Sequence, residues 1–286
     1  MWAAKKAVPI CGFLVLCIKS LTDCKLFSTF AFQTLAKFWK AILTPIKLYM
    51  GLSHSAYREN PIEGTTATLY YFSGRGLADQ IRWMLAATNI DFAQKIIDKR
   101  ARFVDLCDRQ LPFAQLPLLQ IDGYDLVQSQ AIIRYLAKRG NIAGATLFEQ
   151  TKCDMIAESV KDMLPLLTGA PFKRHNGVNP EKISQEIREK WAGLAPRYEA
   201  ILEGNGKKFL VGDSLTYTDV LMAHAITWVV EETEVQSVEL FPNLVALQNT
   251  VINLPGVRAF IRSQLYYPVG NSEYCDVVSA VLARKI

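Results

Sequence analysis

Cysteine and histidine are the side chains that most often carry redox or metal chemistry, and this chain of 286 residues has few of either. No Cys-x-x-Cys pair occurs, and three of the six cysteines lie in the first 56 residues. So few cysteines do not make a disulfide scaffold, which predicts a reduced, intracellular protein body. The three histidines, His54, His175 and His224, have no ligand spacing to one another or to cysteine. We therefore expect no metal site, and we expect His224, within an apolar helical run, to be a core residue.

An aromatic strand followed by a glycine-containing turn is the next candidate for chemistry. Residues 67–72 (ATLYYF) predict a strand, Ser73-Gly74-Arg75-Gly76 a turn, and apolar residues at helical spacing a helix over about 77–88. Because side chains alternate along a strand, the neighbouring Tyr70 and Tyr71 point to opposite faces.

The elements that must position this turn form a small α/β pattern. The sequence predicts a strand at 93–97, a helix near 101–109, a hairpin of strands 118–121 and 125–127 around Asp122-Gly123-Tyr124, and a helix over about 129–138. Strand, helix, strand, helix, hairpin and helix are the order of a thioredoxin-like domain, which we place at residues 67–143. The redox cysteine pair of that fold is missing.

After residue 143 the strand patterns disappear and helical ones continue. An apolar helical face runs from Ile183 to Leu202, and residues 220–230 are apolar nearly all round, as in a helix central to a bundle. Thr216 and Asp219 have the spacing of a capping box at its start. The predicted fold class is an α/β N-terminal thioredoxin-like domain followed by an all-α helical-bundle domain at residues 144–286.

The first 66 residues differ in composition from the rest. Residues 1–56 hold seven lysines against one acid, a net charge of +6, whereas the remaining 230 residues carry −1. The near-neutral body gives no support for nucleic-acid binding. Residues 7–18 form an apolar run, and Leu35 to Ile46 contain an apolar helical face flanked by lysines. We interpret residues 1–66 as an extension and linker, and expect residues 1–50 to contact a membrane surface or act in targeting of an otherwise cytoplasmic protein. A leader without function is the alternative.

Several motifs together resemble cytosolic glutathione transferases over about residues 67–286. They are Leu69-Tyr70-Tyr71-Phe72-Ser73-Gly74-Arg75-Gly76 with Ile81-Arg82-Trp83, then Gln115-Leu116-Pro117, Ile121-Asp122-Gly123, Gln128-Ser129-Gln130-Ala131-Ile132, Phe209-Leu210-Val211-Gly212-Asp213 and Asn253-Leu254-Pro255-Gly256-Val257. Val229-Val230-Glu231-Glu232 and the ending Ala283-Arg284-Lys285-Ile286 look most like the alpha class. Leu111-Pro112-Phe113 looks more like the sigma class.

The resemblance implies that Tyr71 is the catalytic tyrosine. A thiol of pKa near 8.5 is mostly protonated at neutral pH, and the thiolate is the nucleophile. A phenol that donates a hydrogen bond to the thiolate lowers the pKa of that thiol, by about one to two units for a charged hydrogen bond of roughly 1.5 to 3 kcal/mol. The alternative is that Tyr71 only packs in the core.

The resemblance also implies the residues that hold glutathione. Leu116-Pro117 looks like the cis-proline peptide of the fold, whose Leu116 backbone pairs with the extended tripeptide. Gln128 and Ser129 resemble the pair that binds the γ-glutamyl carboxylate, and Ser129 would serve equally as a helix N-cap. Gln115 belongs to the same groove, Arg109 (or else Arg102) would meet the glycyl carboxylate, and Asp162 would reach the glutathione amine across a dimer.

Two positions depart from the family pattern: Leu77 stands where the alpha class has an arginine beside the thiolate, and Gly193 replaces the arginine expected to accompany Asp162. The resemblance nevertheless implies a homodimeric enzyme that conjugates glutathione, its co-substrate, to small hydrophobic electrophiles without a metal. A glutathione-dependent isomerase or peroxidase is the alternative within enzymes. A non-catalytic ligand-binding or structural protein on the same fold is the alternative outside them.

Overall fold

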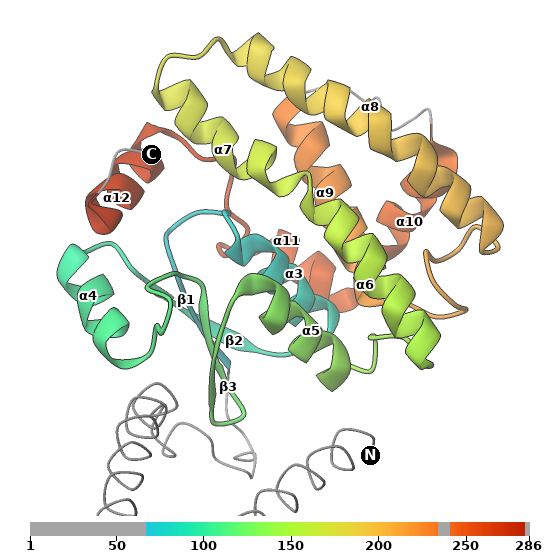
Figure 1. The fold of residues 1–286 in the computed structure, drawn as a ribbon, viewed down its shortest axis with the longest axis horizontal. Helices are drawn as coiled ribbons and strands as arrows, with labels where there is room; N and C mark the ends of the chain where they lie inside the picture. The colour runs from blue at the N-terminus through green and yellow to red at the C-terminus, as the bar shows by residue number, and fades with distance from the viewer. Residues whose placement is uncertain (1–66, 234–240, 284–286) are drawn as a thin grey trace, which may run out of the picture. The chain divides into compact units, whose positions relative to one another are not determined.

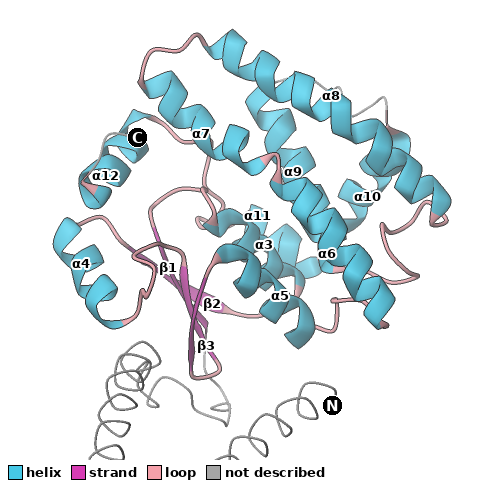
Figure 2. Cartoon of the chain, viewed as in Figure 1, coloured by secondary structure: helices cyan, strands magenta, loops and turns pink. Residues whose placement is uncertain are grey.

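The computed structural model describes residues 67–233 and 241–283 (Figure 1). All of them lie in one compact unit, Arg58–Ile286. The strands gather in one part of this unit, and the helices from α6 onward make up most of the other (Figure 2). The fold is thus a thioredoxin-like sheet half with a helical C-terminal half, which confirms the predicted fold class.

The sheet half begins with a strand, helix and parallel strand, followed by a hairpin. Its elements are β1 (Ala67–Tyr71), α3 (Ala78–Ala87), β2 (Phe92–Ile96), α4 (Arg100–Arg109), β3 (Leu118–Ile121), β4 (Tyr124–Val127) and α5 (Ser129–Arg139). The strand order is β2-β1-β3-β4, with β1 parallel to β2 and the other pairs antiparallel. Asp122 and Gly123 both have positive φ, 51° and 80°, as a two-residue Asp-Gly turn requires. The hairpin is therefore confirmed, with Tyr124 in the strand rather than in the turn.

The helical half packs around α9, which is buried along most of its length. Its elements are α6 (Leu147–Lys161), α7 (Leu164–His175), α8 (Pro180–Gly204), α9 (Tyr217–Thr233), α10 (Pro242–Ile252), α11 (Pro255–Ile261) and α12 (Ser272–Leu282). Helices α6, α8 and α10 lie against α9, which in turn contacts α3 of the sheet half. The sheet half and the helical half therefore share one continuous core.

The predicted cap of α9 is only partly present. The Asp219 carboxylate accepts the Thr216 N–H at 2.7 Å and also the Leu210 N–H at 2.8 Å. The Thr216 hydroxyl, however, bonds to Thr218 and to Asp219 itself. The Asp219 carboxylate thus links the preceding loop to the start of α9, because it accepts hydrogen bonds from two buried backbone N–H groups.

Helix α12 packs against both halves. It contacts α4 of the sheet half, which lies below it at the left of Figure 1, and α7 of the helical half. Its N-cap is Asn271, whose side chain accepts the Tyr274 N–H at 3.0 Å. The strand end that carries Tyr71 is therefore enclosed by elements far apart in the sequence.

Candidate functional site

Tyr71, at the end of β1, is buried, with 6% of its surface exposed. Its hydroxyl oxygen accepts a hydrogen bond from the Leu77 N–H at 3.0 Å. Within the part of the chain that the structure describes, no acceptor takes the hydrogen of this hydroxyl. Tyr71 also lines a cavity, so its O–H is available to donate to a group bound there. The neighbouring Tyr70 points away and donates to Gln120 at 2.6 Å, which confirms the predicted alternation.

The electrostatic surroundings keep Tyr71 protonated. Burial raises the pKa of its phenol, while the Leu77 N–H and the positive charge of Arg82 act in the opposite direction. The Arg82 guanidinium lies 5.9 Å from the centre of the Tyr71 ring. At neutral pH the phenol therefore retains its proton and can stabilise an anion that accepts its hydrogen bond.

Gly76 lets the Tyr71 hydroxyl occupy this place. Its φ is +44°, a conformation that residues with a Cβ adopt only at a cost. A Cβ added there would overlap the Tyr71 hydroxyl oxygen and come within 2.9 Å of the ring atom Cε1. The turn thus needs glycine both for its backbone and for the close approach of the phenol.

The cavity at Tyr71 has a volume of about 490 Å³ and walls from both halves. Leu77, Gln115 and Leu116 line one part of it. Apolar and aromatic side chains from α4, α7 and α12 line the rest: Phe103, Phe172, Tyr274, Val278 and Leu282. A polar edge beside an apolar wall suits a ligand that has one polar and one apolar part.

A second cavity, of about 620 Å³, adjoins the first, because Leu77 and Thr168 line both. Its charged and polar lining includes Gln128, Ser129, Lys161, Asp162 and Lys190. Asp162 therefore lines the same cavity as the predicted pair Gln128 and Ser129.

The Leu116–Pro117 peptide bond is cis, as expected. Leu116 is buried at 9% exposure and lines the first cavity. Among the described residues, none pairs with its backbone N–H or C=O. Because buried backbone groups are almost always paired, these two are available to hydrogen-bond a molecule in the cavity.

Gln128 adopts φ +67° at the start of α5. It occupies the N-cap position itself, so the prediction that Ser129 is the N-cap was wrong by one residue, and Ser129 is the first residue of the helix. The Gln128 amide nitrogen lies 3.3 Å from the Gln115 oxygen, so the structure brings these two predicted residues together. A strained non-glycine backbone at a polar cavity is typical of a binding site.

Arg109 does not reach either cavity. It ends α4 on the solvent side, where its exposed guanidinium pairs with Asp105. Arg102, the alternative, donates to the Ile96 carbonyl at 3.1 Å and likewise lines neither cavity. The structure thus brings neither arginine to Gln115 and Leu116, and the expectation that one of them meets the glycyl carboxylate stays a prediction.

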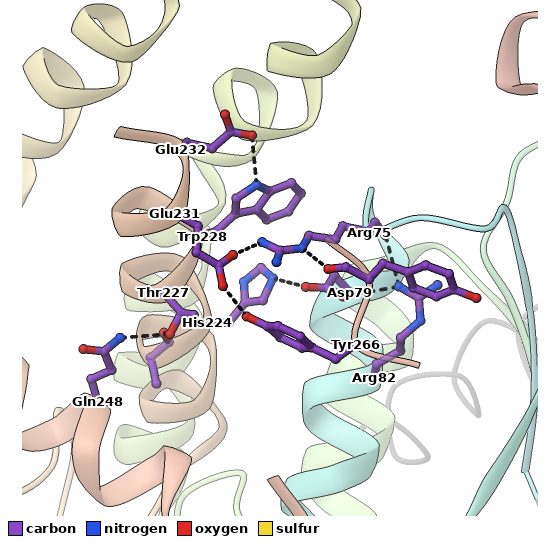
Figure 3. Close-up of polar contacts among 12 residues, drawn as sticks. Arg75, Asp79, Arg82, His224, Thr227, Trp228, Glu231, Glu232, Gln248 and Tyr266 are labelled. Atoms are coloured by element: carbon purple, nitrogen blue, oxygen red, sulfur yellow. Dashed lines mark hydrogen bonds and ion pairs between the residues drawn. The ribbon is translucent and has the colours of Figure 1, made fainter. Parts of the chain in front are cut away.

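An ionic network that the sequence did not predict joins α3 and the turn after β1 to α9 (Figure 3). Asp79 on α3 pairs with Arg82 at 3.3 Å and with the Nε2 atom of His224 on α9 at 3.2 Å. Arg75, in the turn after β1, pairs with Glu231 on α9 and donates to the Tyr267 carbonyl at 2.7 Å. His224 is thus a buried core residue, as expected, and its partner is Asp79.

Other kinds of site are not found among residues 67–233 and 241–283. No group of His, Cys, Asp and Glu there could hold a metal ion, and Cys107, Cys153 and Cys275 are free thiols. No single helix in the same range is long and apolar enough to cross a membrane; only α10 and α11 taken together, bent by 86°, reach the length and composition. The predicted membrane or targeting role of residues 1–50 lies outside the described residues.

Comparisons with known proteins agree with this geometry. A family model described as glutathione S-transferase, N-terminal domain, matches residues 67–138, and one described as glutathione S-transferase, C-terminal domain, matches residues 162–264. The chain is 35% identical to glutathione S-transferase alpha-4 of Rattus norvegicus, over 75% of this chain and 96% of the rat protein. It is 32% identical to glutathione S-transferase 3 of Gallus gallus, over 75% and 93%.

A solved structure is also similar. The glutathione S-transferase Na-GST-3 of Necator americanus, described as monomeric, is 28% identical with a TM-score of 0.60, over 69% of this chain and 96% of that one. The chain therefore belongs to the glutathione S-transferase family, whose members use glutathione as co-substrate. It is accordingly an enzyme of the transferase class.

Proposed function

We propose that glutathione binds with its sulfur beside the Tyr71 hydroxyl and that its thiolate attacks a hydrophobic electrophile in the apolar part of the first cavity. The observation that carries this proposal is the direction of the Tyr71 hydrogen bonds. Because the Leu77 N–H donates to the phenol oxygen, the phenolic hydrogen is left for the sulfur. The thiolate then accepts a hydrogen bond, which lowers the pKa of the thiol and supplies nucleophile at neutral pH.

The tripeptide would extend from the first cavity into the second. The unpaired N–H and C=O of Leu116 would bind its backbone as an added strand. Its γ-glutamyl end would lie at Gln128, Ser129 and Asp162, where the N-terminus of α5 favours a carboxylate and Asp162 an amine.

Retention on immobilised glutathione followed by a generic conjugation assay tests this proposal. We expect the chain to be retained, to be eluted by free glutathione, and to accelerate conjugation of an apolar aryl halide. The pKa of the thiol of bound glutathione should be lower than that of free glutathione in water. Failure to bind glutathione would overturn the proposal, whereas binding without thiol activation would favour a non-catalytic ligand-binding protein.

We further propose that the body is a homodimer, closest to the alpha class. Large apolar side chains are exposed on α6 and on the loop before β3: Phe113 at 61%, Phe148 at 68% and Met155 at 68%. Phe148 and Met155 are two helical turns apart and share a face of α6. Exposed apolar patches of this kind mark contact surfaces, and a two-fold axis would cover both copies at once.

Sedimentation at micromolar concentration tests the dimer. We expect twice the monomer mass for the parent, and a shift toward monomer for a Phe148→Glu, Met155→Lys double variant. Ile201→Glu, on the exposed side of α8, is the control and should leave the mass unchanged. A parent that sediments only as monomer, as the description of the Necator americanus relative states for that protein, would contradict the prediction.

A further inference from the structure

A small cavity of about 190 Å³ lies beside the start of α12 and has no part in the proposed binding of glutathione. It is formed by the turn after β1, the chain that leads into α12, and α12 itself. Val269 and Val277 give it apolar surface, and Ser73 and Glu273 give it polar groups. Among the described residues, Tyr274 alone lines both this small cavity and the first cavity. The two cavities are therefore neighbours that share one side chain.

The ring of Tyr274 separates the small cavity from the first one. Toward the first cavity it packs against Phe172, with the two ring centres 5.7 Å apart, and Phe172 lines the first cavity only. Toward the small cavity it packs against Gly74 and Gly270, which line that cavity only. A Cβ added to Gly74 would overlap the ring, and one added to Gly270 would come within 2.9 Å of it. The ring thus fills the space between the two cavities.

Tyr274 is held in this place by its neighbours and not by its hydroxyl. The Asn271 side chain accepts the Tyr274 N–H at 3.0 Å, which fixes the backbone at the first turn of α12. The Tyr274 hydroxyl has no hydrogen-bond partner among the residues that the structure describes. Burial raises the pKa of its phenol, so the side chain is uncharged at neutral pH. A shorter apolar side chain could therefore replace it without leaving another described polar group unpaired.

We propose that the Tyr274 ring ends the electrophile part of the first cavity and so limits the length of the apolar group that the enzyme accepts. This inference rests on the proposed function, because it needs the electrophile to lie in the first cavity. It makes compact electrophiles the preferred substrates. A long straight alkyl chain gains nothing from the carbon atoms that cannot pass the ring, because these stay in water. The small cavity is the space that such a chain would enter if the ring were shorter.

A series of S-alkyl glutathiones, from S-methyl to S-dodecyl, tests this limit in calorimetric titrations of the full chain. Each carries its alkyl group on the sulfur, where the electrophile would be attached, and none can react as a thiol. Affinity should rise by up to about fourfold for each methylene that becomes buried. For the parent we expect the rise to stop once the alkyl chain reaches Tyr274, so that longer members of the series bind equally.

Tyr274→Ala should let the rise continue, because the first cavity then opens into the small one. We expect the longest alkyl chains to bind the variant about tenfold or more tightly than they bind the parent, as burial of two further methylenes would give. S-methyl glutathione should show no such gain. Tyr274→Leu keeps an apolar side chain against Phe172 and should give a smaller gain in the same direction. It answers the question by itself if the alanine variant does not fold.

Two control variants keep the ring in place. Tyr274→Phe removes only the hydroxyl, and Val277→Ala enlarges the small cavity without opening it to the first. Both should follow the parent along the whole series.

Three results would overturn the inference and leave the proposed function intact, provided that S-methyl glutathione binds. They are long-chain affinities of the alanine and leucine variants equal to those of the parent, a parent affinity that rises without a limit up to S-dodecyl, and an equal gain in Tyr274→Phe. A parent that binds neither glutathione nor its S-methyl derivative would overturn both.

Discussion

Replacing Tyr71 with phenylalanine should reduce conjugation near pH 7 by about tenfold or more. The substitution removes one hydroxyl and keeps the buried ring, so packing against Phe72 and the cavity wall changes little. The thiolate loses a charged hydrogen bond of roughly 1.5 to 3 kcal/mol, which raises the pKa of the bound thiol by about one to two units. Titration of the thiol in the presence of enzyme measures that shift directly, and affinity for glutathione should fall much less.

Tyr70→Phe is the matched control on the same strand. Its hydroxyl donates to Gln120 and accepts from the Lys95 ammonium at 3.2 Å, on the face of the sheet away from the cavity. Its loss should lower the free energy of unfolding by about 0.5 to 1.5 kcal/mol and leave the thiol pKa unchanged. If Tyr71→Phe retained full activity with an unshifted thiol, Tyr71 would be a packing residue only.

Gly76→Ala should affect activity as strongly as Tyr71→Phe, although residue 76 need not touch the substrate. The added Cβ would overlap the phenol oxygen, so the Tyr71 hydroxyl has to leave the position from which it faces the cavity. In addition, an alanine at φ +44° costs about 1 to 2 kcal/mol of stability. We expect a loss of conjugation of about tenfold or more, together with a lower melting temperature, measured by a steady-state assay and a thermal scan.

Gly193→Ala is the control for the same change of residue type. It lies within α8 with open space around it, so alanine should stabilise the helix by about 1 kcal/mol and leave the activity unchanged. An active Gly76→Ala enzyme with a normal thiol pKa would show that the hydroxyl position seen here is not required for the reaction.

The part of the fold that was predictable rests on local signals. Alternation in ATLYYF placed Tyr70 and Tyr71 on opposite faces, and the Asp122-Gly123 pair located the hairpin. Helix α7 could not be derived in this way, because Pro165, Gly169 and Pro171 argue against a helix unless tertiary packing supports it. Helix α6 could not be predicted from hydrophobic periodicity for another reason. Its apolar residues Phe148 and Met155 are exposed, so apolar side chains do not mark a single buried face.

The residues of the candidate site were likewise predictable only where a local sequence motif contains them. Tyr71, Leu116 and Gln128 were found because short motifs carry them, and the structure brings all three to the two cavities. The apolar wall from Phe172 and Tyr274 was missed, because it forms only when α7 and α12 meet. The contact of Arg75 with Tyr267 spans 192 residues, a separation at which no sequence periodicity operates.

The buried charges between α3 and α9 limit how freely one half could be exchanged for that of a relative. The Arg82 and Asp79 side chains are buried, and the second partner of the Asp79 carboxylate is His224 in the other half. A recombinant that joined this sheet half to the helical half of a relative would leave a buried charge uncompensated unless the relative carried equivalent partners, and such a charge costs about 3 to 5 kcal/mol. We therefore expect that exchange of electrophile preference between relatives is easier by grafting α12 than by swapping the whole helical half.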